Sequence, residues 1–204
     1  MKSLLLVGGG GHCHSCIDVI EATGIYQIKG VVQPKFSSEV VLGYPVIGSD
    51  DDLPRLLTGN ESALITVGQI KNSETRTRLY DRLKQLGVEL PVIISPRAYC
   101  SKYTVIGEGT IIMHGTILNA AARIGKNCIV NSQALIEHDV EIDDHCHIST
   151  GARVNGGVTI GKGSFVGSGA VIKENVRVGE NVIIGAGQII LRDLPNGKVV
   201  KHVV

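Results

Sequence analysis

One short segment of the chain concentrates side chains that can move protons. Residues 131–157 hold three of the seven histidines, and His138 is followed directly by Asp139. An imidazole titrates near neutrality and is a common general base, and an adjacent carboxylate can orient it and stabilise its charged form. We interpret His138 and Asp139 as a candidate base with its supporting acid, rather than as ordinary residues of a solvated turn.

A strict six-residue repeat must position these side chains. A helix repeats apolar residues at spacings of three and four and a strand alternates them, so neither explains the pattern. Six residues per strand and turn, with three such units per coil of eighteen, are typical of a left-handed parallel β-helix of hexapeptide repeats. The aliphatic positions, which we expect to face a narrow interior, are Ile106, Ile112, Leu118, Ile124, Val130, Ile136, Ile142, Ile148, Val154, Ile160, Val166, Ile172, Val178, Ile184 and Ile190.

Glycines recur at the spacing of one whole coil. Gly107, Gly125, Gly161 and Gly179 are separated by multiples of eighteen residues, with Asp143 at the intervening place. We expect them to stack at one corner, where the backbone requires a positive φ that favours glycine.

Counting by eighteen residues also predicts where the candidate catalytic residues lie on the β-helix. Gly156 follows His138 by one coil, so bare backbone should lie over the imidazole and leave a shallow notch. His147 follows by half a coil and should lie on another face of the prism. His147 of one prism can approach His138 of a neighbour if three prisms pack side by side, which predicts a homotrimer with its active sites between subunits.

The first 95 residues follow a different pattern. Apolar strands at residues 3–7, 28–32, 63–67 and 91–94 alternate with helical stretches at 15–22 and 74–86. This order is typical of a small Rossmann-like α/β unit with a parallel sheet. We therefore predict an α/β domain at 1–95, a linker at 96–104 and the β-helix domain at 105–204.

A glycine-rich turn follows the first strand. Gly10, Gly11 and His12 lie where a helix begins, and backbone N–H groups at such a place favour a phosphate. The dinucleotide fingerprint requires a third glycine where this chain has Cys13, so an NAD site is not predicted. We expect a nucleotide-linked or phosphorylated ligand, the alternative being that the glycines only make a tight turn.

Composition excludes several classes of function. The formal net charge is +1 and the basic residues are scattered, so no nucleic-acid partner is expected. No apolar run is long enough to span a bilayer, and the apolar stretch at the start is too short for a signal peptide, which predicts a cytoplasmic protein.

The cysteines and histidines do not suggest a metal centre. The five cysteines are expected to be reduced, and Cys128 and Cys146 occupy small inward positions of the repeat. The clusters at residues 12–16 and 145–147 lack the four-ligand spacing of structural zinc, so we predict no metal.

With these features, the chain resembles the hexapeptide-repeat sugar acetyltransferases of the sialic acid O-acetyltransferase NeuD and bacillosamine-pathway PglD type. The resemblance covers nearly the whole chain and is most specific at residues 136–149, IEHDVEIDDHCHIS, followed by Gly151 and Gly156. It implies an acetyl-CoA-dependent transferase acting on a nucleotide-linked amino sugar.

The resemblance also implies residue roles. His138 would be the general base supported by Asp139, and His147 with the N–H of Gly156 would stabilise charge on the acetyl carbonyl. The other matching positions are Asn131 near the acceptor sugar, Gly156, Gly167 and Ala186 along coenzyme A, and Gly10, Gly11 and His12 at the nucleotide. At Gln33 and Pro34 the chain departs from the UDP-sugar branch, which commonly carries acidic residues there.

Three other functions remain open on the sequence. The chain could O-acetylate a sialic-acid-like sugar, or it could be a trimeric scaffold without activity. Zinc-dependent carbonic anhydrase chemistry also occurs on this fold and would need three converging ligands, for which His114, His138 and His147 do not have a clear spacing.

Overall fold

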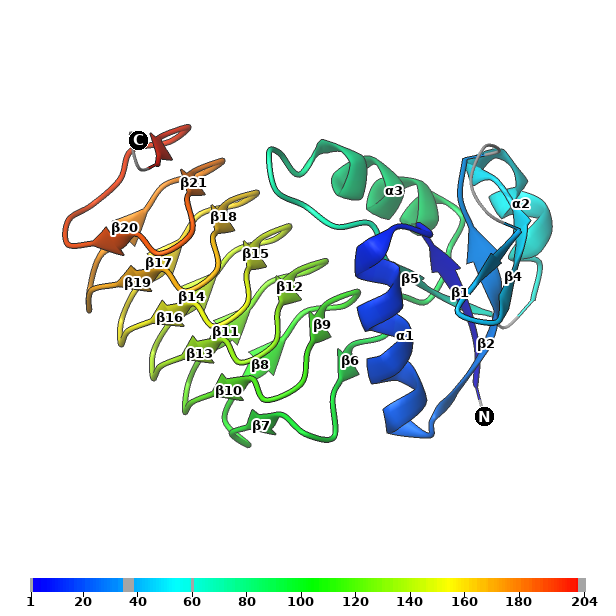
Figure 1. The fold of residues 1–204 in the computed structure, drawn as a ribbon, viewed down its shortest axis with the longest axis horizontal. Coiled ribbons are helices and arrows are strands. Elements are labelled where there is room, and N and C mark those ends of the chain that lie inside the picture. The colour runs from blue at the N-terminus through cyan, green and yellow to red at the C-terminus, as the bar shows by residue number, and fades with distance from the viewer. Residues whose placement is uncertain (1, 35–38, 60, 202–204) are drawn as a thin grey trace.

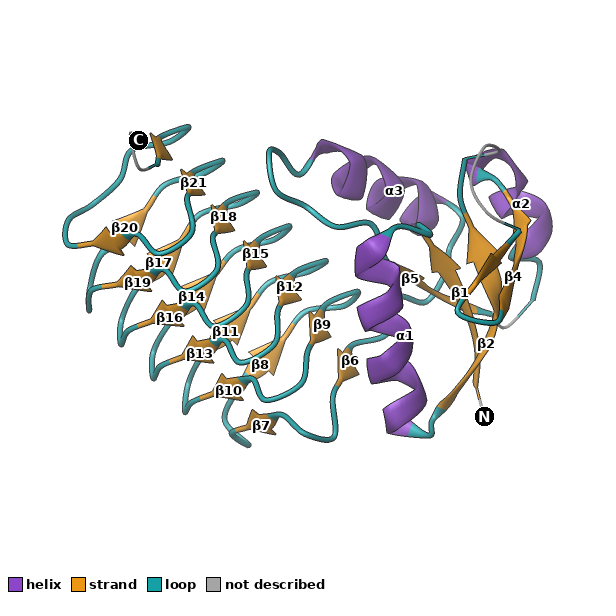
Figure 2. Cartoon of the chain, in the orientation of Figure 1, coloured by secondary structure: helices purple, strands orange, loops and turns teal. Residues whose placement is uncertain are grey.

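The computed structural model describes residues 2–34, 39–59 and 61–201 and divides them into an N-terminal α/β unit and a C-terminal β-helix (Figure 1). The described helices all lie in the α/β unit, and the β-helix consists of short strands and turns (Figure 2). None of these helices is long and apolar enough to cross a membrane. The order of the two parts is the predicted one.

The α/β unit is built on a five-stranded sheet with the order β3-β4-β2-β1-β5. Strand β1 (Lys2–Val7) pairs in parallel with β2 (Tyr26–Val32) and β5 (Ser62–Ile65), as predicted. The short strands β4 (Tyr44–Gly48) and β3 (Val40–Val41) extend the β2 edge, and β3 runs antiparallel to β4. The sequence pattern missed these two strands, because neither is a continuous buried apolar run.

Helix α1 joins the two parts of the molecule. It spans Gly11–Thr23, longer at both ends than predicted, and Gly24 ends it with a φ of 64°. Its buried residues share one apolar cluster with Leu4 and Leu6 of the sheet and with Ile111 and Ile129 of the β-helix. The remaining helical elements are α3 (Glu74–Gln85), the short α2 (Leu53–Leu56) and the 3-10 turn η1 (Asp50–Asp52).

Three parallel sheets form the faces of the β-helix, and each is named here by its first strand. The β6 sheet, which α1 covers at its N-terminal end, contains β6 (Ile93–Ile94), β9 (Ile111–Ile112), β12 (Ile129–Val130), β15 (His147–Ile148), β18 (Phe165–Val166), β21 (Ile183–Ile184) and β23 (Val199–Val200). The β7 sheet contains β7 (Tyr99–Cys100), β10 (Ile117–Leu118), β13 (Leu135–Ile136), β16 (Arg153–Val154), β19 (Val171–Ile172) and β22 (Ile189–Ile190). The β8 sheet contains β8 (Val105–Ile106), β11 (Arg123–Ile124), β14 (Glu141–Ile142), β17 (Thr159–Ile160) and β20 (Arg177–Val178).

The interior of the prism is the predicted one. From Ile112 to Ile190 every aliphatic residue of the six-residue series is buried, and Ile106 packs against this core from the end. The small residues two places earlier are buried as well, and Cys128 and Cys146 are among them as free thiols. The repeat therefore specifies the core directly.

The β-helix begins earlier than predicted. The strand expected to close the α/β unit is β6, which pairs with β9, and the predicted linker contains β7, which pairs with β10. The six-residue series continues backwards in register as Cys100, which packs against the core, and Ile94, which is 38% exposed at the first coil. A thiol at position 100 interrupts the aliphatic pattern, so the sequence predicts a linker where the structure has the first coil.

The glycine corner exists, but its physical reason differs from the one predicted. Positive φ values occur at other turn residues, such as Gly157 and Asn175, and not at Gly107, Gly125, Gly161 and Gly179. A Cβ built on Gly107 would lie 2.6 Å from the carbonyl carbon of Gly125 in the next coil. Glycine is required there because successive coils approach too closely for a side chain.

Candidate active site

His138 and Asp139 form a hydrogen-bonded pair at the corner between the β7 and β8 sheets. His138 Nδ1 lies 2.8 Å from Asp139 Oδ2, and the two side chains are 66% and 67% exposed in the single chain. A carboxylate only accepts hydrogen bonds, so Nδ1 carries the proton and Nε2 keeps a free lone pair. Asp139 also occupies the left-handed turn position, with a φ of 58°. The pair can therefore accept a proton at Nε2.

Gly156 lies over the imidazole, as the count of eighteen predicts. A Cβ built on Gly156 would lie 2.7 Å from His138 Cε1, so any side chain there would push the ring aside. The N–H of Gly156 has no hydrogen-bond partner among the described residues. A free backbone donor therefore lies beside the candidate base, as an oxyanion site requires.

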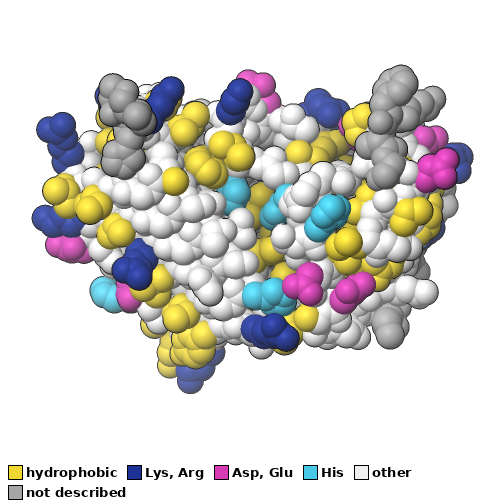
Figure 3. All heavy atoms as spheres, viewed as in Figure 1, with side chains coloured by type: hydrophobic (Ala, Val, Ile, Leu, Met, Phe, Trp, Pro, Cys, Tyr) yellow, Lys and Arg dark blue, Asp and Glu magenta, His cyan; other side chains and the backbone are white. Residues whose placement is uncertain are grey.

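A separate cavity of about 920 Å³ lies between the glycine-rich turn and the β6 sheet. Gly10, Gly11 and His12 line one side of it, and Asn131 and His147 line the other. No described residue of its lining is Asp, Glu, Lys or Arg. Figure 3 shows histidine side chains at the surface where the two parts of the molecule meet. We call this cavity the glycine-turn pocket.

The glycine turn opens its backbone to this pocket. A Cβ on Gly9 would collide with the Gln33 side chain, whereas a Cβ on Gly10 or Gly11 would meet nothing within 4 Å. Gly10 is the N-cap of α1 and makes no side-chain cap, so N–H groups of the first turn can bind an anion. The geometry fits the predicted phosphate site.

Burial keeps the two histidines of the pocket neutral. It lowers the pKa of His12 to about 3, with a further contribution from the nearby positive charge of Arg76. Burial likewise lowers the pKa of His147 to about 4, against the opposing effect of its hydrogen bond to Gln69. Arg76 is fully buried and binds the carbonyl oxygens of Ile65 and Val67 at 2.9 and 2.7 Å. The side chains that line the pocket are therefore uncharged, and the charged guanidinium of Arg76 is buried near them.

His147 lies on β15 and is only 6% exposed. Its Nδ1 lies 2.6 Å from the backbone oxygen of Gln69, which only accepts, so Nδ1 carries the proton. In the neutral ring, Nε2 is then an acceptor, and its neighbour is Asn131 Nδ2 at 3.4 Å. The predicted role of His147 as a donor to an acetyl carbonyl does not fit this arrangement, because the only N–H of the ring is already engaged.

The residues predicted to contact coenzyme A lie at two corners of the prism. A Cβ on Gly167 would lie 2.6 Å from Ala186 N, so these two residues are neighbours in successive coils. They follow β18 and β21, at the corner between the β6 and β7 sheets. His138 and Gly156 lie at the other edge of the β7 sheet. One chain alone therefore does not bring the two sets together.

Several residues of the pocket were not predicted. Gln69 follows β5, at the carboxyl edge of the parallel sheet where ligands commonly bind in α/β folds, and that rule could have identified it. Phe165 replaces an aliphatic residue at an outward position of the repeat, and its ring lies 5.2 Å from that of His147. Ser149 and Ser168 close the same end and share a 2.9 Å hydrogen bond.

The other candidate ligand histidines have structural partners. His114 Nδ1 lies 2.6 Å from Ser95 Oγ, and its Nε2 lies 2.9 Å from Asp18 Oδ2 of α1. The ring therefore links the β-helix to the α/β unit. His145 is buried and lies 2.9 Å from Asn127 Nδ2. Among the described residues, no group of three or more His, Cys, Asp or Glu side chains is arranged to hold a metal ion.

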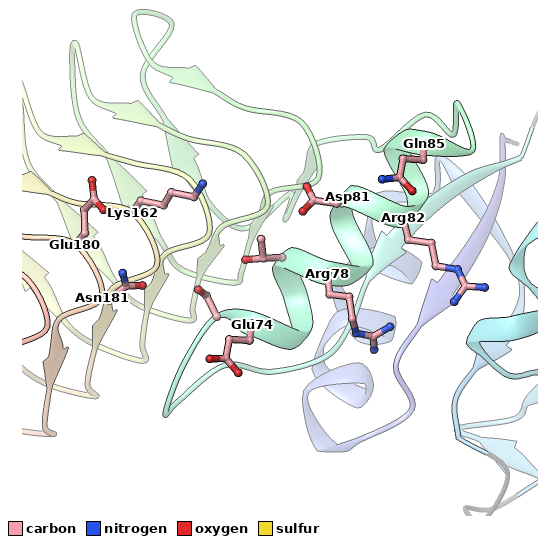
Figure 4. A pocket seen from close by; sticks show the side chains of 10 residues that line it. Glu74, Arg78, Asp81, Arg82, Gln85, Lys162, Glu180 and Asn181 are labelled. Atoms are coloured by element: carbon pink, nitrogen blue, oxygen red, sulfur yellow. The ribbon is translucent and has the colours of Figure 1, made fainter.

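A second groove of about 890 Å³ lies between α3 and the corner of the β-helix at Lys162 and Glu180 (Figure 4). It carries charges of both signs, with Arg78 and Asp81 among the labelled side chains. None of the predicted site residues lines it, so the candidate chemistry belongs to the dyad and the glycine-turn pocket.

Two family models match the chain. The PglD N-terminal domain matches residues 3–83, and the bacterial transferase hexapeptide (six repeats) matches residues 103–138, 121–156 and 157–187. A curated relative, UDP-N-acetylbacillosamine N-acetyltransferase of Bacillus subtilis (strain 168), is 36% identical over 118 residues. That match covers 55% of this chain and 52% of the relative, so it spans about half of either protein.

Solved structures match over almost the whole chain. The acetyltransferase domain of PglB from Neisseria gonorrhoeae FA1090, in complex with acetyl coenzyme A, is 32% identical with a TM-score of 0.91, covering 97% of this chain and 95% of that one. PerB from Caulobacter crescentus, in complex with CoA and GDP-perosamine, is 32% identical with a TM-score of 0.91, covering 98% and 93%. With both halves of the fold and the hexapeptide repeats matched, this chain belongs to the PglD-type hexapeptide-repeat sugar acetyltransferases.

Proposed function

We propose that this protein transfers the acetyl group of acetyl-CoA to the amino group of a nucleotide-linked amino sugar. The observation that carries the proposal is the His138–Asp139 pair, with its free Nε2 beside the bare backbone of Gly156. An amine must lose a proton as it attacks a thioester, and this pair can accept one. The solved relatives bind acetyl coenzyme A, or CoA with GDP-perosamine, which supports the same substrate classes here.

The reaction follows from the protonation state of the dyad. The amine attacks the thioester carbonyl carbon while His138 Nε2 takes its proton, and the Asp139 carboxylate stabilises the imidazolium that forms. The N–H of Gly156 would donate to the carbonyl oxygen as negative charge develops on it. The C–S bond then breaks, and the proton returns from His138 to the departing thiolate of coenzyme A.

The glycine-turn pocket is the proposed site of the nucleotide-linked sugar. Gly10, Gly11 and the first turn of α1 would bind the diphosphate through backbone N–H groups. Gln33 and Pro34 line the same end, where the nucleoside would lie. The sugar would then extend along Asn131 and His147 toward Phe165. Because the lining carries no acidic side chain among its described residues, nothing there repels the phosphates.

We also propose that the active enzyme is a homotrimer. The outward positions of the β7 sheet form a column that is apolar except for Arg153, and in it Tyr99, Ile117 and Ile189 are 61%, 41% and 68% exposed. On the β8 sheet the corresponding positions include Arg123, Glu141 and Arg177. Packing of the apolar column against a second copy would cover it, and would bring one subunit's dyad toward its neighbour's coenzyme residues.

Ile117→Asp should therefore give monomers in light scattering and lose activity.

We propose that the reaction takes place in the cytoplasm, where acetyl-CoA and nucleotide-linked sugars are available. Incubation of the purified protein with acetyl-CoA and a UDP- or GDP-linked amino sugar should release free coenzyme A thiol in step with N-acetylated product. The matched control is the same nucleotide sugar with a hydroxyl in place of the amine. A sialic-acid-like acceptor tests O-acetylation in parallel. Turnover with neither class of acceptor contradicts the proposal.

A further inference from the structure

Two side chains on the β-helix wall of the glycine-turn pocket are each held in one orientation. Asn131 Oδ1 accepts the N–H of Ser132 at 2.8 Å, so its amide NH₂ group points the other way, toward His147. His147 donates its Nδ1 proton to the Gln69 carbonyl at 2.6 Å, so its Nε2 presents a lone pair. The wall therefore offers a donor and an acceptor side by side.

The contact between these two groups leaves both available to a ligand. Asn131 Nδ2 and His147 Nε2 are 3.4 Å apart, longer than the usual 2.9 to 3.0 Å of an N–H hydrogen bond. Asn131 also has a second N–H, and both residues line the cavity. A ligand atom that both donates and accepts can bind to the two groups together.

We propose that Asn131 and His147 bind one hydroxyl group of the acceptor sugar, with the hydroxyl donating to His147 Nε2 and accepting from Asn131 Nδ2. This inference rests on the proposed function and adds specificity-determining roles to it. A phosphate or carbonyl oxygen only accepts and would face the imidazole lone pair. An ammonium group only donates and would face the amide N–H groups.

The reacting amine does not fit the pair either. A neutral amine needs its lone pair to attack the thioester, and a hydrogen bond from Asn131 to that lone pair would block the attack. A hydroxyl has no such conflict, because it uses one lone pair and its own proton. The pair therefore fixes the sugar by a hydroxyl and leaves the amine free to reach the dyad.

Gln69 is the positioning residue for this arrangement. Its side-chain Nε2 donates to the backbone oxygens of His145 at 2.9 Å and Gly163 at 3.3 Å, which anchors its loop on the β-helix. The same residue's carbonyl then selects the Nδ1-protonated form of His147. A residue of the α/β unit thus sets the hydrogen-bonding character of a β-helix side chain.

The first test reads the tautomer without any substrate. In ¹⁵N-histidine-labelled protein at pH 7, long-range ¹H–¹⁵N spectra should show His147 protonated at Nδ1 only, with the signal assigned by its loss in His147→Ala. Gln69→Ala should produce a mixture of the two tautomers. A wild-type ring protonated at Nε2 overturns the proposal, whatever the enzyme acetylates.

The second test measures binding of the sugar to the full-length protein by calorimetry. The probes are the nucleotide-linked amino sugar and analogues in which one ring hydroxyl at a time is replaced by hydrogen. One analogue should bind wild type about ten- to a hundredfold more weakly, the cost of leaving buried polar groups unpaired. The difference in affinity between that analogue and the parent sugar should be smaller in His147→Ala, where only Asn131 still contacts the hydroxyl.

Two controls complete this test. Removal of the exposed His14 (His14→Ala) should leave the discrimination between analogues intact. If every analogue loses the same affinity in wild type and in His147→Ala, no hydroxyl is bound by the pair and the proposal is wrong. Binding with this discrimination but without acetyl transfer would support the pair and contradict the proposed function, so the two failures can be told apart.

Discussion

His138 of the dyad and His147 of the pocket differ in exposure and in the hydrogen-bond partner of Nδ1. His138 is two-thirds exposed in the single chain and bonded to a carboxylate, whereas His147 is 6% exposed and bonded to a backbone carbonyl. In both rings Nδ1 carries the proton and Nε2 holds the lone pair. The two rings differ in how readily they bind a second proton. A carboxylate stabilises the imidazolium that forms, whereas burial beside Arg76 opposes its formation.

This difference separates two functions within one molecule. A general base must take up a proton and release it in each cycle, which the environment of His138 permits. A specificity-determining group must keep one pattern of donors and acceptors, which the environment of His147 enforces. In the proposed mechanism, the same type of side chain would therefore act in catalysis at His138 and in recognition at His147.

The largest expected effect comes from removing the group that exchanges the proton. His138→Ala should lower kcat by about 10² to 10⁴, the usual range for a lost general base, with little change in KM for the acceptor. The unfolding free energy should change by less than about 0.5 kcal/mol, because the side chain is exposed. Steady-state thiol release and chemical denaturation measure the two quantities, with His14→Ala as the control. Unchanged turnover in His138→Ala would remove the dyad from the mechanism.

The next effect tests whether the position of the ring matters as much as its presence. Gly156→Ala keeps the backbone N–H but places a Cβ 2.7 Å from His138 Cε1, so the exposed ring must move. A displacement of this kind should lower kcat by ten- to a hundredfold. In a His138→Ala background the same substitution should cost less than about twofold. Equal losses in both backgrounds would mean that Gly156 acts independently of the ring.

The sequence predicted the dyad's geometry better than the pocket's. Counting by eighteen was enough to place Gly156 over His138, because a β-helix turns each interval in sequence into a fixed position in space. The pocket depends on Gln69 of the α/β unit meeting β15 of the β-helix, a contact between segments 78 residues apart. No periodicity relates these segments, so the sequence alone does not show that the Gln69 carbonyl occupies the N–H of His147, to which the resemblance assigns a donor role.

The start of the β-helix also could not be predicted from the periodicity of the sequence. The six-residue register runs back to Cys100 and Ile94, but the thiol interrupts the aliphatic pattern by which the repeat is recognised. Pairing with β10 identifies Cys100 as a core position, and pairing is a property of the fold. Periodicity specifies an element only while the residues that carry it remain uniform.

A third prediction concerns stability against pH. The unfolded chain binds a proton on each histidine near pH 6.5, but His12 and His147 in the folded state do so only near 3 and 4. Between these values the unfolded state binds more protons, so stability falls as the pH drops below 6.5. Each imidazole should cost about 1.6 kcal/mol between pH 6.5 and 5, because the unfolded ring is half protonated at pH 6.5 and the slope approaches about 1.4 kcal/mol per pH unit only below it.

Urea unfolding at pH 6.5 and pH 5 measures this loss above the range in which carboxylates are protonated. His147→Asn keeps an N–H donor near the Gln69 carbonyl but cannot titrate, so it should remove the contribution of His147 to the slope. His12→Asn should do the same for His12. A slope that is the same in wild type and both variants would show that these rings are protonated in the folded protein.

The smallest effect should come from the charge of Asp139. Asn is tolerated at the left-handed φ of 58° and can still accept a hydrogen bond, so Asp139→Asn removes the negative charge and little else. The charge stabilises the imidazolium across a 2.8 Å contact, but both side chains are two-thirds exposed and water weakens the interaction. We expect kcat to fall about tenfold, equivalent to about 1.4 kcal/mol, with KM and stability nearly unchanged. Asp139→Ala should lower stability as well, because alanine is strained at this φ. A loss beyond about a thousandfold in Asp139→Asn would mean that the dyad is desolvated when substrate is bound, and the contrast between an exposed and a buried histidine would then hold only for the free enzyme.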